Sequence, residues 1–176
     1  VDNTAKTLDD LEYFKNEYGC SIIYNVQNCG VAKAYNQIME FFSVQNIEYV
    51  LTLDQDSVCP TNIIEEYLKF IDVSRCGILC PVLDYKGDKR GVEKDAEFVE
   101  VGTCISSASL INIDAWKESG GFDENLFIDF VDFDFCYAIR EKGFKIYQIQ
   151  SVHLDHELGN LKVEYLLGTK IMVTNH

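Results

Sequence analysis

Two aspartates follow directly after an apolar run in the sequence. Residues 48–53 are nearly all apolar, and Asp54 and Asp56 come next as an Asp-x-Asp pair. Such a run predicts a strand buried on both faces, and open α/β sheets bind ligands at the carboxyl ends of their strands. Two carboxylates one residue apart repel each other unless a cation lies close by, and oxygen ligands suit Mg²⁺ or Mn²⁺. The pair therefore fits a metal site, or else a solvated turn before the helix that Pro60 opens.

Three more aspartates lie among aromatic residues later in the chain, at Asp129, Asp132 and Asp134. A carboxyl group with apolar neighbours tends to have a raised pKa, which suits a general base. Asp132 and Asp134 would lie about 200° apart around a helix, so we expect them to serve different purposes. We interpret Asp134 as a structural residue near the start of a helix, where acidic side chains act as caps.

Two other stretches carry polar groups that could contact a ligand. Residues 28–36 form a turn that leads into a helix with small residues in its first turn, which can bring backbone N–H groups close to an anion. The same residues also fit an ordinary turn. His153 and His156 follow a strand and could offer an imidazole to a metal, although they do not form a His-Glu-x-x-His zinc helix. They also fit polar histidines in a loop.

Alternating strands and helices must position these groups. The patterns predict helices at 7–17, 31–43, from 60 to about 71, 114–119 and 131–142. Strands are expected at 20–25, 48–53, 77–83 and 144–152, with two apolar stretches within 98–112 and an exposed loop at 84–95. This order predicts an α/β fold with a mostly parallel sheet flanked by helices.

Length and composition restrict the class of protein. A chain of 176 residues suits one domain. Its 15 Lys and Arg against 29 Asp and Glu give a net charge of −14, which argues against nucleic acid as a partner and against broad attachment to anionic lipid. No apolar run approaches the roughly 18 residues needed to cross a bilayer. We interpret the seven cysteines as reduced packing residues of an intracellular protein, since their number is odd and none forms Cys-x-x-Cys.

The order of these motifs along the chain is more informative than any one motif alone. The stretches concerned are 1–3, 28–36, 53–57, 102–103 with 106–107, 121–132 and 156–159. Together they resemble the inverting glycosyltransferases of family 2, which have the GT-A fold. The similarity is greatest to the bacterial rhamnosyltransferases that build surface polysaccharide.

This resemblance implies roles for particular residues. Asp132 would be the catalytic base, with Asp129 as a competitor, because many relatives carry a Glu where this chain has Val131. Asp56 and His156 would bind the metal. Asp129 and Trp116 would contact the acceptor, and Phe127 and Phe130 would help to shape its pocket. Core packing is the alternative for Trp116, Phe127 and Phe130. The nucleotide-sugar would be bound by Asp2, Gly30, Val31, Ala32, Lys33 and Asp54.

The resemblance also implies an activity and a setting. We expect metal-dependent, inverting transfer of a sugar, with rhamnose as our choice, from a nucleotide-diphosphate sugar to a saccharide or lipid-linked acceptor in polysaccharide or O-antigen synthesis. The expected place is the cytoplasm, at the inner face of the membrane. The alternatives are a nucleotide-sugar binding module without catalysis and a nucleotidyltransferase. Relative to the family, residues 1–176 look like a single catalytic domain trimmed at both ends, with a strand missing beside 49–53.

Overall fold

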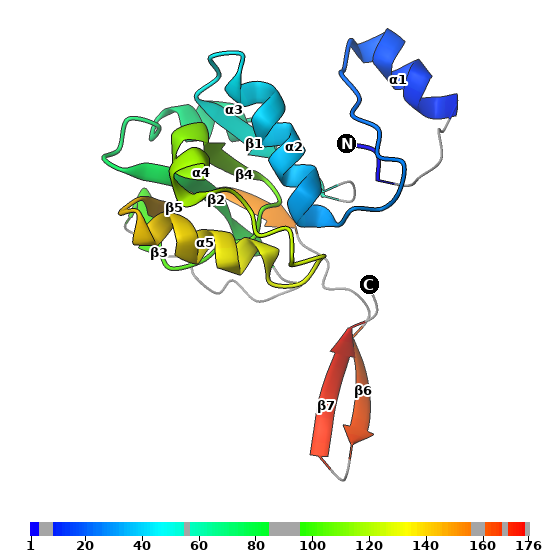
Figure 1. Cartoon of the computed structure of the whole chain (residues 1–176). Helices are drawn as coiled ribbons and strands as arrows, with labels where there is room; N and C mark the ends of the chain where they lie inside the picture. Colours follow the sequence, from blue (N-terminus) through cyan, green and yellow to red (C-terminus); the bar gives the residue numbers. More distant parts are fainter. Residues whose placement is uncertain (4–8, 55–56, 85–95, 156–160, 167–168, 175–176) are drawn as a thin grey trace.

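Five strands form one mixed sheet in the computed structural model, which describes residues 1–3, 9–54, 57–84, 96–155, 161–166 and 169–174 (Figure 1). In spatial order they are β1 (Tyr49–Thr52), β4 (Ser109–Asn112), β2 (Cys76–Asp84), β5 (Lys145–Asp155) and β3 (Phe98–Val101). The predicted α/β class is confirmed. β1 forms one edge of this sheet. That a strand of the family is missing beside β1 stays a prediction.

The direction of the strands differs from the prediction. β2 and β5 are parallel, whereas β1 with β4, β2 with β4 and β3 with β5 are antiparallel. The prediction of a mostly parallel sheet was therefore wrong for these five strands. The cause lies between β2 and α4, where the described residues contain no helix, because parallel neighbours need a long crossover that is usually helical. Without such a crossover, β3 and β4 run antiparallel to the strands beside them.

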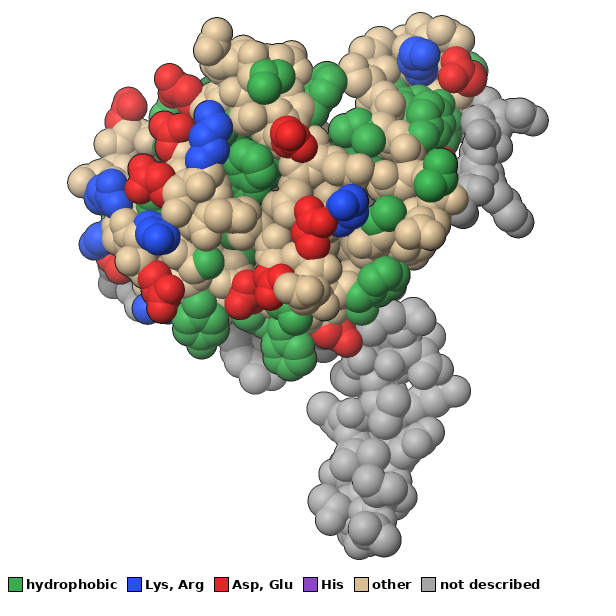
Figure 2. Space-filling view, viewed as in Figure 1, with side chains coloured by type: hydrophobic (Ala, Val, Ile, Leu, Met, Phe, Trp, Pro, Cys, Tyr) green, Lys and Arg blue, Asp and Glu red, His purple; other side chains and the backbone are tan. Residues whose placement is uncertain are grey.

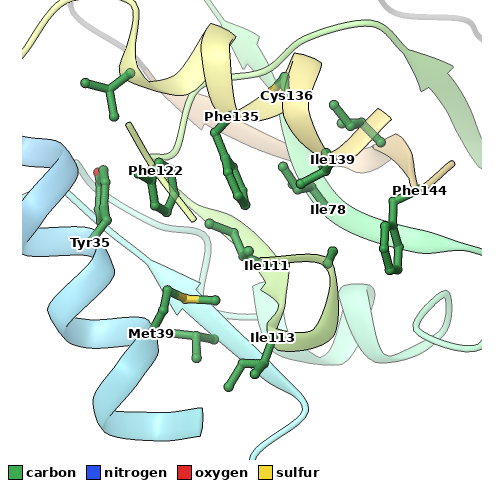
Figure 3. Close-up of a cluster of buried hydrophobic side chains, with 14 of the residues drawn as sticks. Tyr35, Met39, Ile78, Ile111, Ile113, Phe122, Phe135, Cys136, Ile139 and Phe144 are labelled. Carbon is green, nitrogen blue, oxygen red and sulfur yellow. The ribbon is translucent and has the colours of Figure 1, made fainter. Parts of the chain in front are cut away.

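Helices cover both faces of the sheet. On one face lie α2 (Val31–Ser43), α4 (Ile113–Ser119) and α5 (Val131–Glu141), and on the other lies α3 (Ile63–Leu68). Successive side chains of a strand point to opposite faces of the sheet, so the buried residues fall into two groups, one on each face. Ile78 of β2 and Ile111 of β4 meet Met39 of α2 and Phe135 of α5 (Figure 3). Leu79, the next residue along β2, packs instead with the α3 side of the core.

Local sequence explains where the helices begin and end. α2 starts directly after Gly30, whose positive φ of 84° ends the preceding turn, and it spans the residues that its apolar spacing predicts. α4 begins where the Asn112 side chain accepts a hydrogen bond from the Ala115 N–H at 2.8 Å. It ends at Gly120, in the left-handed conformation typical of helix C-termini. α5 starts at Val131, the residue at which the sequence predicts it.

Three further segments complete the description. α1 (Asp9–Tyr18) matches the first predicted helix, and a single parallel bridge between Asp2 and Tyr24 takes the place of the strand predicted at 20–25. A separate hairpin of β6 (Leu161–Leu166) and β7 (Thr169–Thr174) was not predicted. Most of the loop predicted at 84–95 lies outside the described residues. The assignment of residues 1–176 to one partial domain stays a prediction. No helix in the described segments is long and apolar enough to cross a membrane.

Candidate active site

The carboxyl end of β1 carries Asp54, whose carboxylate is exposed and accepts a hydrogen bond from the Tyr35 hydroxyl at 3.2 Å. The Asp54 backbone N–H donates to Ser107 Oγ at 3.3 Å. Just before it, the buried Thr52 hydroxyl lies 2.5 Å from the Ser106 carbonyl oxygen. These contacts fix the end of β1 against the segment that precedes β4.

Asp132 lies opposite, in the first turn of α5. Its carboxylate is half-buried and accepts a hydrogen bond from the Ser106 hydroxyl. Burial raises the pKa of Asp132, the hydrogen bonds from Ser106 oppose that rise, and the negative charge of Asp54 adds to it. A narrow recess beside the carboxylate is lined by Ser106, Phe135 and the thiols of Cys104 and Cys136. The structure thus brings Asp54 and Asp132 into one cluster, joined by hydroxyl groups.

The turn at Gly30 packs against the segment that leads into α5. The Val31 N–H donates to the Phe127 carbonyl oxygen at 2.7 Å. A Cβ atom on Gly30 would lie 2.6 Å from that same oxygen, so the approach requires glycine. The Ala32 side chain is buried in the core, and Lys33 Nζ lies 3.1 Å from a carboxylate oxygen of Glu124. The roles of these residues as nucleotide contacts stay predictions.

The first three residues lie beside this turn. The Asp2 backbone pairs with the chain at 23–25, through its N–H to the Ile23 carbonyl at 2.8 Å and through its carbonyl to the Asn25 N–H at 3.0 Å. Asn3 donates its side-chain amide to the Gly30 carbonyl at 2.9 Å. Asp2 is therefore placed near the predicted nucleotide segment.

Trp116 and Asp129 have different surroundings. The Trp116 indole N–H donates to Asn36 Oδ1 at 3.0 Å, and the half-buried ring packs against the core on the α2 side. Asn36 also donates to the Phe122 carbonyl at 2.9 Å, so it ties α2 to the turn after α4. This favours the packing role that the sequence left open for Trp116. Asp129 is exposed in the segment before α5, three residues from Asp132.

The two predicted metal ligands, Asp56 and His156, lie outside the described residues. Within the described segments, no group of three or more His, Cys, Asp or Glu side chains is placed to hold a metal. Val58 and Asp155 form an isolated antiparallel bridge. The chain just after residue 56 therefore lies beside the chain just before residue 156. His153 is paired with Asp84, with Nδ1 3.1 Å from a carboxylate oxygen.

Sequence analysis missed two residues of the cluster. Tyr35 lies within the helix predicted at 31–43 and Ser106 within a matching stretch, but neither was given a role. The available signal was a tyrosine on a helix face whose other residues carry no hydrogen-bonding group, since a buried phenol needs a hydrogen-bond partner. All seven cysteines are free, and the sulfur atoms of Cys104 and Cys136 lie 3.8 Å apart.

Known proteins resemble this chain in fold and in sequence. The solved structure of GalNAc-T7 with UDP, GalNAc and Mn²⁺ aligns with a TM-score of 0.68 at 15% identity, covering 84% of this chain and 34% of that one. The structure of TarS from S. aureus aligns with a TM-score of 0.59 at 17% identity, covering 89% of this chain and 29% of that one. These similarities identify the GT-A fold that the sequence predicted.

Sequence comparison defines the family. The chain is 25% identical over 154 residues to the dTDP-rhamnosyl transferase RfbF of Shigella flexneri, which covers 78% of this chain and 52% of that protein. The chain thus spans about half the length of this curated relative. The model of "Glycosyl transferase family 2" matches residues 1–141, most of the 176 residues. From Val1 to the end of α5, this chain belongs to glycosyl transferase family 2.

Proposed function

We propose that this chain forms the donor-binding and catalytic part of an inverting glycosyltransferase, with Asp132 as the general base. The observation that carries the proposal is the environment of Asp132. Its carboxylate is half-buried, oriented by Ser106 and coupled to Asp54 at the carboxyl end of β1. A raised pKa makes a carboxylate a stronger base than it is in water, which is what deprotonation of a sugar hydroxyl requires.

The proposed reaction is a single displacement. Asp132 accepts the proton of an acceptor hydroxyl while that oxygen forms a bond to the anomeric carbon of the donor sugar. The bond from this carbon to the diphosphate oxygen breaks on the opposite side, which inverts the configuration. No covalent enzyme intermediate forms, so the reaction needs no nucleophilic side chain. Ser106 keeps the Asp132 carboxylate in one orientation during the proton transfer.

We also propose a divalent cation, held by Asp56 and His156 close to Asp54. Carboxylate oxygens and an imidazole are suitable ligands for Mn²⁺, and carboxylates alone suit Mg²⁺. The Val58–Asp155 bridge supports this pairing, because it joins the two segments that carry the proposed ligands. A structurally similar protein was crystallised with UDP and Mn²⁺. When bound, such an ion stabilises the negative charge of a departing diphosphate.

For the substrates, we propose dTDP-rhamnose as donor and a saccharide or lipid-linked saccharide as acceptor. The support for the donor is the dTDP-rhamnosyl transferase of Shigella flexneri, at 25% identity. We also propose a role in polysaccharide or O-antigen synthesis at the cytoplasmic face of the membrane, which is what the resemblance of the sequence motifs implies. Figure 2 shows acidic side chains spread over the face of the molecule that is in view, and the net charge is −14. Such a surface fits a neutral saccharide better than an anionic membrane.

The decisive experiment compares three Asp→Asn variants in the full chain, by the release of dTDP from dTDP-rhamnose in the presence of acceptor. Asp132→Asn should lower kcat by about 10²–10⁴-fold with donor affinity kept, because removing a general base typically costs that much. Asp129→Asn should lose less, mainly in acceptor KM. Asp134→Asn is the matched control, since Asp134 is an exposed carboxylate in the same turn of α5.

Two outcomes would contradict the proposal. If Asp132→Asn keeps a near-normal kcat and Asp129→Asn is inactive, the base is Asp129. If the wild-type chain binds dTDP with Mn²⁺ but transfers no sugar to any acceptor, the binding module without catalysis is the better description.

A further inference from the structure

A buried phenol lies against the Asp54 carboxylate of the candidate site. Tyr35 of α2 is 7% exposed, and its hydroxyl donates to Asp54 Oδ1 at 3.2 Å. Its ring packs on Phe122 with the centroids 5.1 Å apart (Figure 3). A phenylalanine could fill the same space, so packing explains the ring of Tyr35 but not its hydroxyl.

Other buried or half-buried tyrosines use their hydroxyl groups differently. Tyr67 donates to the Ala108 carbonyl at 2.7 Å, Tyr49 to the Ile71 carbonyl at 3.0 Å and Tyr147 to the Ser74 carbonyl at 3.2 Å. Backbone carbonyls are the usual partners of buried hydroxyls. Tyr35 instead donates to the carboxylate of Asp54, which the family resemblance assigns to the nucleotide-sugar site.

The electrostatic surroundings keep this phenol protonated. Burial raises the pKa of Tyr35 far above its ordinary value, and the negative charges of Asp54 and Asp132 raise it further. At neutral pH the Tyr35 hydroxyl therefore keeps its proton and donates a hydrogen bond to the Asp54 carboxylate. Its hydroxyl can orient a neighbouring carboxylate without cancelling that carboxylate's charge.

We propose that Tyr35 is a positioning residue, which fixes the Asp54 carboxylate for the nucleotide-sugar and sets it in register with the Ser106–Asp132 pair. The inference rests on the proposed function, because Asp54 must contact the donor for its orientation to matter. The Tyr35 hydroxyl joins α2 to the end of β1, and the Ser106 hydroxyl joins the segment before β4 to the start of α5.

A double-mutant cycle on binding tests this role without relying on catalysis. The probe is dTDP with MnCl₂, titrated into the full chain and followed by ligand-observed NMR, which also reaches weak affinities. Tyr35→Phe should weaken dTDP binding about 3- to 10-fold, the range expected when one hydrogen bond no longer holds a binding group in place. In an Asp54→Asn background, Tyr35→Phe should cause little further loss, because the carboxylate that it orients is gone.

Tyr49→Phe is the matched control, since it removes a half-buried hydroxyl at the far end of β1 from Asp54. It should leave dTDP affinity unchanged. Equal weakening by Tyr35→Phe in both backgrounds, or no weakening in the wild-type background, would overturn the positioning role while leaving the proposed function intact. Absence of dTDP binding by the wild-type chain would overturn the proposed function and this inference with it. In steady-state kinetics, the positioning role requires a larger effect on donor KM than on acceptor KM.

Discussion

Substitution of Gly30 by alanine should separate the two segments that frame the candidate site. Gly30 has a φ of +84°, and a Cβ atom there would lie 2.6 Å from the Phe127 carbonyl oxygen and 3.0 Å from the Phe127 ring. That oxygen also accepts the Val31 N–H at 2.7 Å. One of the two segments must move, and the hydrogen bond that joins them is then lost.

Two contributions determine the size of the effect. Gly30 combines its positive φ with a ψ of 170°, a region essentially restricted to glycine, which costs a residue with a Cβ about 1–3 kcal/mol. Loss of the hydrogen bond between Val31 and Phe127 adds about 0.5–1.5 kcal/mol. We therefore expect Gly30→Ala to lower the free energy of unfolding by about 1.5–4.5 kcal/mol. Gly120→Ala is the control, since φ there is +90° but no atom lies within 4 Å of the new Cβ, so it should cost about 1–2 kcal/mol.

Urea unfolding of both variants measures the difference. Because the segment from Phe127 leads directly into Asp132, we also expect Gly30→Ala, and not Gly120→Ala, to lower sugar transfer. Equal losses of stability in the two variants would refute the reasoning, because both the close approach of Phe127 and the ψ of 170° at Gly30, against 8° at Gly120, should make Gly30→Ala the more costly change.

Two other predictions concern the carboxylates. Asp56→Ala should abolish the divalent-ion dependence of dTDP binding in calorimetric titration while the fold stays intact; unchanged metal-dependent affinity would remove Asp56 from the proposed site. The second concerns stability. The pKa of Asp132 is raised in the folded state, so the stability that its protonated form contributes is complete below the unfolded-state pKa of about 4 and is lost as pH rises through the folded-state pKa. Asp132→Asn should therefore become more stable than wild type as pH rises, by about 0.5–2 kcal/mol near neutrality. Urea unfolding of both proteins measures this difference, and a difference that is the same from about pH 4 to about pH 7 would contradict the prediction.

Sequence patterns were sufficient for the helices but not for the sheet. α2 spans 31–43 as predicted, because its apolar residues recur at helical spacing and Gly30 ends the preceding turn. α5 begins at Val131 as predicted, directly after Phe130, whose φ is 64°. The position of β4 between β1 and β2 depends on pairing between residues far apart in sequence, and a short apolar run does not encode the direction of its neighbours.

The side-chain contacts of the candidate site could also be predicted only in part from the sequence. The apolar run was enough to predict that Asp54 follows the end of a strand, but its neighbour Ser107 belongs to the segment before the antiparallel strand β4, which the run does not indicate. The partners of Lys33 and Trp116 are Glu124 and Asn36, which lie 91 and 80 residues away in the chain. Such partners are set by how α2 packs on the turn after α4, and no local pattern contains that information.

The chemical type of the partners explains how this site can hold two carboxylates and still use them. In the described residues, the hydrogen bonds to the Asp54 and Asp132 carboxylates come from the neutral hydroxyls of Tyr35 and Ser106. An Arg or Lys in their place would lower the pKa of Asp132 and weaken it as a base. It would also cancel the charge that attracts a cation to Asp54. Hydroxyl donors fix the direction of each carboxylate and leave its charge in place, so Asp132 remains available to a proton and Asp54 to a ligand that brings positive charge.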